Sequence, residues 1–376
     1  MVAWNGSRNL EIPVQQRNRT VTDGKIEIAN LVFLSSMDRS ETRTYYVMSG
    51  NQAGSKNYDD LVKTSTSDDY SISTDSFKTV FTESNGGLVT DIVSRVGSNR
   101  SMVGSSPIDR YPEMSIGINT FTPRKESGPD FSSTEGSLYS KFTFKGDASE
   151  DPSKPYTQTC EVYAKTSYMV CEKNQSTTTG ESISNFFFNS LFLEDELMTR
   201  FEYMNSSKIN SSEKLESGNS NNIQGIDDQS RWVAFYNNRT GDGLADIFLD
   251  STYPKTDNPE IELQDNDQND FYRSKIADSI SVSQGTHFYS KTARLVFNGL
   301  KKSEIVNRTY NQLENPVTVF KGQEFTRDKL PPNYTVKGNI SSDDSSSAKI
   351  FSRWTDDSLL DYAEINITGN GENGTE

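Results

Sequence analysis

Apolar and polar residues alternate one by one along much of this chain, which is the period of a β-strand with one buried face. The alternation is clear at 138–145, 197–203 and 293–297. Residues 84–87 lie between two apolar stretches and carry the Asn-Gly pair typical of a hairpin turn. A helical period is visible over 303–313, where we expect one short helix.

The strand pattern predicts an all-β protein, because runs of strands without intervening helices form antiparallel sheets. The strands exceed one immunoglobulin-size sandwich of about 100 residues, so we expect a large antiparallel β-sandwich, or two sandwiches in series. Pro316, Pro331 and Pro332 accumulate beyond it, and proline is poorly tolerated inside central strands. We therefore predict a large β-sandwich domain at 1–315 and a small β module with the C-terminal tail at 316–376.

Composition agrees with strands that have one wet face. Only 32% of residues are hydrophobic, yet 11% are aromatic, and a disordered chain of this polarity is normally poor in aromatics. The 38 Lys and Arg against 53 Asp and Glu give a net charge of -15. A polyanion would be repelled by that charge, so we do not expect nucleic acid as a partner.

No stretch approaches the roughly twenty apolar residues of a membrane span. We therefore expect contact with a membrane only through parts missing from this chain. The first residues lack the apolar core of a signal peptide, so an exported protein would be present here in a processed or trimmed form.

The two cysteines favour export. Cys160 and Cys171 flank a segment that resembles strand, tight turn and strand, with Lys165 and Thr166 at the turn. By that count the cysteines face one another across a hairpin, within reach of a disulfide. The alternative is a pair of free buried thiols.

Possible N-glycan acceptors, the Asn-x-Ser/Thr triplets, occur twelve times. Glycans are attached outside the cytoplasm, so the triplets indicate an extracellular or cell-surface location. Several fall where we expect turns, at Asn174, Asn205, Asn210 and Asn238, whereas Asn366 lies in an expected strand. The full set is Asn5, Asn18, Asn99, Asn174, Asn205, Asn210, Asn238, Asn307, Asn333, Asn339, Asn366 and Asn373.

Two regions resemble known families. Residues 353–365, with Arg353-Trp354-Thr355-Asp356-Asp357-Ser358-Leu359, resemble the W-x-D-x-S/G-L run of immunoglobulin-like modules in microbial, especially archaeal, surface proteins. This resemblance implies that 316–376 is a partial immunoglobulin-like module, because such a module needs several more strands. It is then truncated, or it receives a strand from elsewhere.

The central region resembles the super-sandwich of galactose-mutarotase-like domains and of the sugar-active enzymes that carry them. The resemblance lies in Gly86-Gly87-Leu88-Val89-Thr90-Asp91-Ile92 after an apolar strand, and in many long strands. Mutarotases of this kind use a His pair with a Glu, and His287 is the single histidine of this chain, so that catalysis is excluded. No catalytic residue is singled out, and the sequence favours a non-enzymatic protein.

Two acidic segments are candidate calcium sites, since calcium takes oxygen ligands. Residues 238–246 place oxygen side chains, Asp242 and Asp246 among them, at four positions of a calcium loop, but Leu249 replaces the final Glu. The second segment, 265–270, contains Asp265, Asp267 and Asp270. Calcium is the one cofactor considered, and solvated acidic loops are the alternative.

We therefore expect a structural or adhesive, non-enzymatic extracellular module of a glycosylated cell-surface, surface-layer or appendage protein. Its partners would be other surface-protein subunits or surface glycans. One alternative is a carbohydrate-binding or carbohydrate-active protein of the glycosidase or lyase kind. A viral surface glycoprotein is a further alternative with the same composition.

Overall fold

The structure is a computed structural model, and most of the residues between 60 and 314 are described. The described residues are 2–4, 9–11, 13–22, 25–36, 44–46, 60–67, 69–102, 107–204, 210–215, 222–227, 230–253, 260–266, 269–299, 301–314, 321–322, 338–339, 349–353, 360–364 and 367–368.

The chain divides into two compact units. The larger comprises 62–135 and 140–310, and the smaller comprises 1–61, 136–139 and 311–376. The sequence had placed one division at residues 315/316; one boundary of the units lies near it, but the structure also groups the N-terminal segment with the C-terminal strands.

Antiparallel sheets dominate the described residues, so the predicted all-β class is confirmed. The described part of the chain contains one α-helix, α1 (Lys302–Glu314), which confirms the short helix expected at 303–313.

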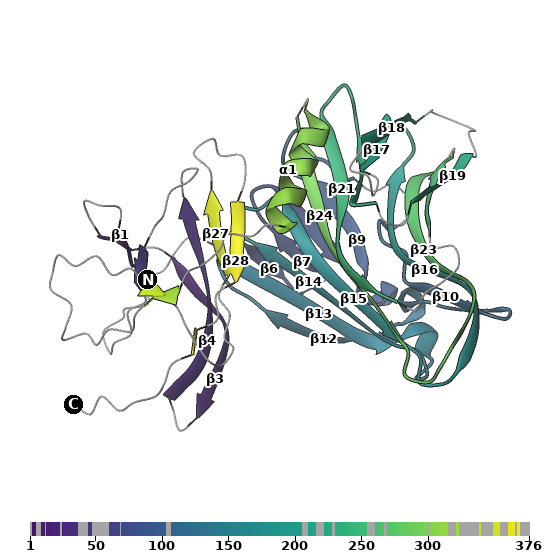
Figure 1. Cartoon of the computed structure of the whole chain (residues 1–376), viewed down its shortest axis with the longest axis horizontal. Helices are drawn as coiled ribbons and strands as arrows, with labels where there is room; N and C mark the ends of the chain where they lie inside the picture. Colours follow the sequence, from purple (N-terminus) through teal and green to yellow (C-terminus); the bar gives the residue numbers. More distant parts are fainter. Residues whose placement is uncertain are drawn as a thin grey trace. The chain divides into compact units, whose positions relative to one another are not determined.

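The larger unit is built on a nine-stranded sheet, most of which is seen in Figure 1. Its strands, in spatial order, are β12 (Asp130–Thr134), β13 (Tyr139–Asp147), β14 (Pro155–Tyr163), β15 (Tyr168–Ser176), β24 (His287–Asn298), β21 (Asp242–Thr252), β20 (Trp232–Tyr236), β17 (Arg200–Met204) and β18 (Asn210–Lys214).

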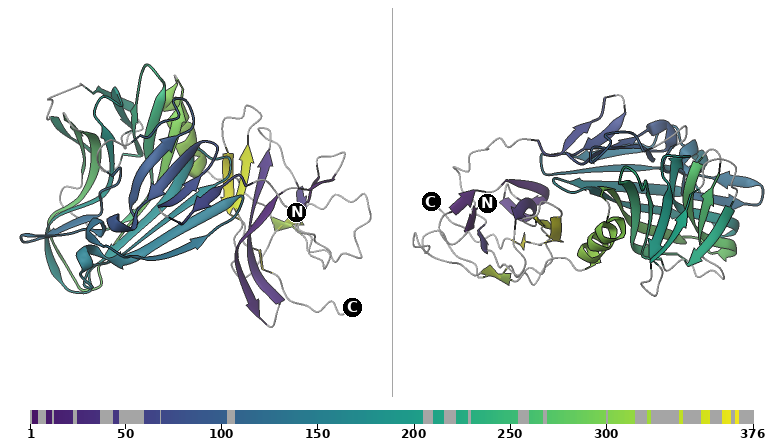
Figure 2. Two further views of the ribbon diagram at one scale, coloured as in Figure 1. Left: turned by 180° about the vertical axis from the view of Figure 1, so that it is seen from behind. Right: turned by 90° about the horizontal axis from the view of Figure 1, so that it is seen from above.

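Two smaller sheets complete this unit. The six-stranded sheet consists of β11 (Asn119–Phe121), β10 (Glu113–Ile116), β16 (Glu181–Glu194), β23 (Asn269–Val282), β22 (Glu260–Asp265) and β19 (Asn222–Asp227). The four-stranded sheet consists of β6 (Lys63–Ser65), β7 (Tyr70–Ser73), β8 (Phe77–Phe81) and β9 (Val89–Ser94). In the left view of Figure 2 the four-stranded sheet, in blue, lies across the strands of the large sheet.

Aromatic side chains hold the smaller sheets to the large one. The Phe81 ring of β8 lies 5.7 Å from the Phe142 ring of β13, and the Phe186 ring of β16 lies 4.6 Å from the Phe288 ring of β24. All four rings are at most 1% exposed, and both centroid distances lie in the favourable range for aromatic pairs.

The hairpin expected around 84–87 is present, with β8 and β9 paired antiparallel and a short 3₁₀ turn, η1 (Glu83–Asn85), between them. Gly87 adopts a φ of +72°, and a Cβ there would lie 2.1 Å from the Phe144 ring. Because both the backbone and the space exclude a side chain, this glycine lets the turn approach β13 closely.

The large sheet has a wet face and a dry face at β15. Asn174 is exposed and Lys291 forms an ion pair of 2.9 Å with Glu172, whereas the neighbouring Lys173 and Gln175 are buried. This alternation follows the period of two. At β20, α1 lies against the outer face of the sheet. There Trp232 donates a hydrogen bond of 2.8 Å to Asn307 of the helix.

Beneath that helix the strands are buried on both faces. Residues 292–297 of β24 form an uninterrupted buried run, although their apolar residues alternate in sequence. Trp232, at 0% exposure, is therefore a core residue.

In the smaller unit, β4 (Lys25–Ser36) pairs antiparallel with β3 (Val14–Thr22) and parallel with β27 (Lys349–Arg353). It is thus an N-terminal strand that completes the C-terminal sheet. The other strands are β28 (Leu360–Glu364) and β29 (Ile367–Thr368) in the same sheet, β1 (Val2–Trp4), β2 (Asn9–Glu11) and β5 (Thr44–Tyr46) in a second, and β25 (Lys321–Gly322) with β26 (Gly338–Asn339) in a third.

Candidate functional sites in the larger unit

The disulfide predicted from the hairpin is present. Cys160 of β14 and Cys171 of β15 are direct cross-strand neighbours and are joined by an S–S bond. Lys165 lies in the turn with a φ of +63°. Both cysteines are at most 6% exposed and lie on the buried face of the sheet. The bond therefore joins two inner strands of the large sheet, β14 and β15, on its core side.

The glycan acceptors that the structure describes differ in the exposure of their side chains. Asn99, Asn174 and Asn238 are exposed. Asn174 lies within β15 and Asn210 at the start of β18, not in turns as expected, whereas Asn238 does lie in a turn, between β20 and β21.

Asn307 is a poorer acceptor, because its side chain is half-buried on α1 and accepts the bond from Trp232. The hydroxyl of its triplet, on Thr309, is fully buried and donates to the Ile305 carbonyl. The side chains of Asn18, Asn210 and Asn339 lie outside the described residues, as do Asn5, Asn205, Asn333, Asn366 and Asn373 altogether.

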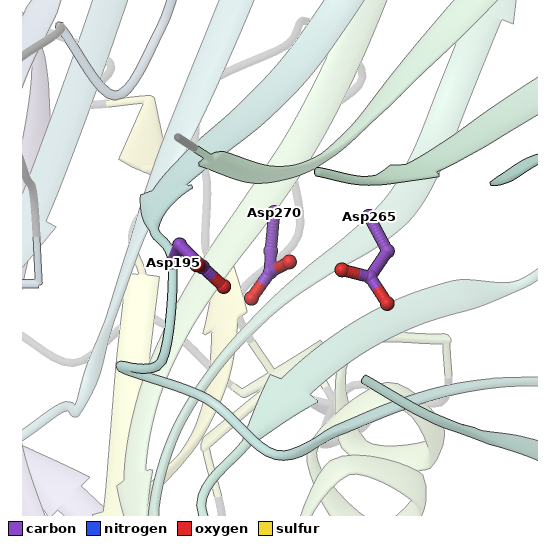
Figure 3. Close-up of side chains that lie close together, drawn as sticks. All are labelled: Asp195, Asp265 and Asp270. Atoms are coloured by element: carbon purple, nitrogen blue, oxygen red, sulfur yellow. The ribbon is translucent and has the colours of Figure 1, made fainter. Parts of the chain in front are cut away.

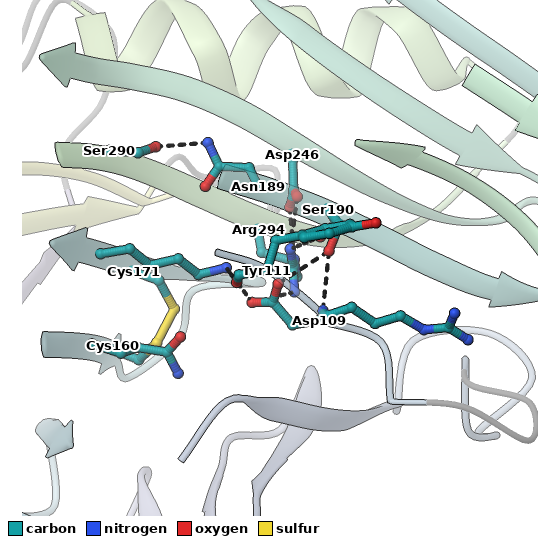
Figure 4. Close-up of polar contacts among 12 residues, drawn as sticks. Asp109, Tyr111, Cys160, Cys171, Asn189, Ser190, Asp246, Ser290 and Arg294 are labelled. Carbon is teal, nitrogen blue, oxygen red and sulfur yellow. Dashed lines mark hydrogen bonds and ion pairs between the residues drawn. A yellow bond between two sulfur atoms is a disulfide. The ribbon is translucent and has the colours of Figure 1, made fainter. Parts of the chain in front are cut away.

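A network of buried charges connects the two larger sheets (Figure 4). Arg294 of β24 forms a bidentate ion pair with Asp246 of β21, with both N–O distances 2.7 Å. The Tyr272 hydroxyl of β23, in the opposite sheet, donates to the same carboxylate. All three residues are at most 5% exposed.

The network continues into the loop that precedes β10. The Lys173 ammonium lies 2.6 Å from the Asp109 carboxylate and donates to the Tyr111 carbonyl at 2.9 Å. The Ser190 hydroxyl of β16 donates to Asp109 at 3.3 Å, and the Ser190 carbonyl accepts from Arg294 at 2.8 Å. Two acids thus face two cations, and the loop is anchored to both sheets.

Burial and charge set the protonation of this network. Burial lowers the pKa of Lys173, an effect that the Asp109 carboxylate opposes. Burial and the Asp246 carboxylate raise the pKa of Tyr272 well above its ordinary value. The pKa of Arg294 is raised despite burial, chiefly because of Asp246.

With these side chains paired and shielded from solvent, the network has the properties of a structural core. Removing one partner would leave an uncompensated buried charge, which is far more costly than the pair itself. Tyr272, Lys173 and Arg294 are at most 5% exposed.

In the first predicted calcium segment, the two carboxylates, Asp242 and Asp246, have different hydrogen-bond partners. Asp246 is committed to Arg294, as described. The Asp242 carboxylate instead accepts hydrogen bonds from the Ser98 backbone N–H at 3.2 Å and the Asn298 amide at 2.9 Å. These bonds lower the pKa of Asp242 although burial opposes them.

The second segment does contribute to a cluster of carboxylates, formed by Asp195, Asp265 and Asp270 (Figure 3). Among the His, Cys, Asp and Glu residues that the structure describes, these are the three that bring one ligand atom each within 4.8 Å of the others. Asp265 ends β22 and Asp270 is its direct partner on β23, while Asp195 follows β16 on the other side of β23. Asp267 lies outside the described residues.

Asp270 is the most constrained member. It is 0% exposed, and neither carboxylate oxygen meets a hydrogen-bond donor. Burial, followed by the charges of Asp265 and Asp195, raises the pKa of Asp270 to about 9. In its protonated form Asp270 can donate a hydrogen bond to Asp265. In its ionised form it is repelled by the neighbouring carboxylates of Asp265 and Asp195.

Sequence reasoning found Asp265 and Asp270 but missed Asp195, which follows the apolar stretch of β16 in an acidic triplet, 194–196. It also missed the buried partners Asp109, Lys173 and Arg294. The side of the sheet that Lys173 faces could have been inferred from the sequence, because residues two apart on a strand lie on the same face and Cys171 is two residues away. His287 is exposed at the start of β24.

A small pocket lies where β21, β22 and β23 approach one another. Phe248, Asp250, Glu260 and Lys275 contribute to its lining. The Lys275 Nζ atom lies 3.6 Å from Glu260 Oε1. The pocket therefore combines the Phe248 ring with a pair of opposite charges.

No protein-family model and no curated protein matches this chain. Similar solved structures include a TPR-domain containing protein from Parabacteroides distasonis, 10% identical with a TM-score of 0.45, matched over 70% of this chain and 51% of that one. They also include a galactose mutarotase-like protein from Lactobacillus casei (10%, TM-score 0.41, 61% and 100%) and the GH36 α-galactosidase AgaB from Geobacillus stearothermophilus (9%, TM-score 0.47, 67% and 43%).

The chain thus spans about half of the first of these proteins. In the described part of the chain no helix is long and apolar enough to cross a membrane.

Proposed function

We propose that this chain is a structural, non-enzymatic module of an exported, N-glycosylated surface protein. The observation that carries the proposal is the buried cross-strand disulfide between Cys160 and Cys171. Disulfides persist in oxidising compartments and are rare in the cytosol. A bond at the centre of a large sheet stiffens a module that must hold its shape outside the cell.

Two further features support this proposal. Asn99, Asn174 and Asn238 present their side chains on the surface, as glycan acceptors must. In addition, the charged residues most suited to chemistry, such as Arg294 and Asp246, are neutralised by one another in the core. Such a module would assemble with other surface-protein subunits.

Intact-mass measurement of the chain purified from its native source tests the proposal. We expect a mass that falls on treatment with an N-glycosidase, and thiols that react with alkylating reagents only after reduction. A native protein with the unmodified mass and two free thiols would overturn the proposal.

A second candidate function is saccharide binding, favoured by the pocket at Phe248. Saccharides bind where an aromatic ring lies beside groups that donate and accept hydrogen bonds, and Asp250, Glu260 and Lys275 provide these. The ligand would be a surface glycan.

A glycan array probed with the whole chain tests this second candidate. We expect binding that Phe248→Ala weakens at least tenfold and that Asp130→Asn, a change of an exposed acid on the distant edge strand β12, leaves intact. Silence of the native chain on acidic and neutral glycans, or equal binding by both variants, would contradict it.

A further inference from the structure

We propose that Asp195, Asp265 and Asp270 bind one calcium ion at the shared end of β16, β22 and β23. The site does not depend on the proposed export of the protein; only the affinity range given below does.

The geometry fits a single ion. Calcium binds oxygen at 2.3–2.6 Å, so two of its ligands lie at most about 5 Å apart. One oxygen from each of the three carboxylates satisfies that limit, since all lie within 4.8 Å of one another. The strand register imposes this spacing, because Asp270 is opposite Asp265 and next to the strand that leads into Asp195.

The independent sign of a ligand is the Asp270 side chain. Figure 3 shows it pointing into the space between Asp195 and Asp265. It is fully buried, and neither of its oxygens meets a hydrogen-bond donor. When ionised, this side chain is a buried carboxylate without a donor and lies directly opposite a like charge on the neighbouring strand, and both conditions are costly. A cation at this point would satisfy those oxygens and offset the repulsion.

The ligand set favours calcium over magnesium. Three carboxylates from strand ends supply hard oxygens at spacings that calcium's irregular coordination accepts. Magnesium demands near-octahedral geometry and prefers to keep several waters, whereas Asp270 is shut off from solvent. Asp195 is half-buried, and water can complete the coordination there.

Isothermal titration calorimetry tests the site on the whole chain after treatment with EGTA and dialysis. We expect one calcium per chain, with a Kd on the order of 10⁻⁴ to 10⁻³ M, the range of extracellular modules. We expect Asp270→Asn and Asp195→Ala to weaken binding at least tenfold. The matched control, Asp130→Asn, removes one exposed acid from the other sheet and should bind like the native chain.

Circular dichroism and a thermal melt in EGTA establish that each variant is folded, and Asp195→Ala, at a half-buried turn, remains informative if Asp270→Asn does not fold. Absence of calcium heat with the native chain would overturn the proposal, as would unchanged affinity in both cluster variants. Magnesium binding equal to calcium would overturn the choice of ion. The glycan measurement is a separate readout, so failure of one proposal is distinguishable from failure of the other.

Discussion

Replacing Asp270 by Asn should stabilise the protein when calcium is absent. Asp270 is fully buried, with Asp265 and Asp195 as neighbours, and its pKa rises from 3.8 to about 9. Between those values the native state holds a proton that the unfolded chain has released. Stability therefore falls as the pH rises across this window, by about 1.4 kcal/mol for each pH unit.

The size of the effect follows from that window. At pH 7 the pH lies about three units above the unfolded pKa, so the native state loses about 4 kcal/mol relative to a group that does not titrate. Asparagine has nearly the same shape and does not titrate, and its amide can donate to Asp265. We expect Asp270→Asn to gain about 2–4 kcal/mol at pH 7, allowing for imperfect hydrogen bonding of the amide.

Urea unfolding in EGTA at pH 5 and pH 8, followed by circular dichroism, measures this gain. The advantage of Asp270→Asn should grow by about 1.4 kcal/mol for each pH unit, which is about 4 kcal/mol between pH 5 and pH 8. Asp130→Asn, on the exposed edge, should differ little from the native chain at either pH. A variant that is less stable than the native chain at pH 8, or a difference that does not grow with pH, would refute the reasoning.

Three further measurements address other parts of the larger unit. Cys160→Ser, which removes the bond to Cys171, should lower the free energy of unfolding by about 2–3 kcal/mol in non-reducing urea titrations; a native chain equally weakened by reductant supports this, and an unaffected one contradicts it. Arg294→Met leaves the buried Asp246 carboxylate without its positive partner and should cost about 3–5 kcal/mol in the same titration; a neutral effect would show that the network does not stabilise the core. If the protein is glycosylated as proposed, Asn174→Gln should remove the mass of one glycan, whereas Asn307→Gln should leave the glycan mass unchanged, and the reverse result would contradict the burial of Asn307.

Short-range features were predicted from the sequence because they depend on neighbouring residues. The alternation at 293–297, the short helix and the hairpin at 84–87 each have a local period or turn signal. The disulfide belongs with them, since only 11 residues separate Cys160 from Cys171 and the turn sets their register.

Burial on the second face of a strand was not predictable in the same way. The period of two assigns residues to faces but does not say what covers a face. The outer side of β24 is dry because α1 folds back over it, through contacts such as that of Trp232 with Asn307. That covering comes from the path of the chain after β24.

By itself the sequence therefore determined the strand class, the local hairpins with their disulfide, and an acidic composition that disfavours nucleic acid. Only the tertiary structure decided which distant charges meet. Asp195 joins Asp265 and Asp270 because β16 pairs with β23, and Arg294 meets Asp246 because β24 pairs with β21. Pairing between strands far apart in the chain depends on the packing of whole sheets, and no local pattern of residues records it.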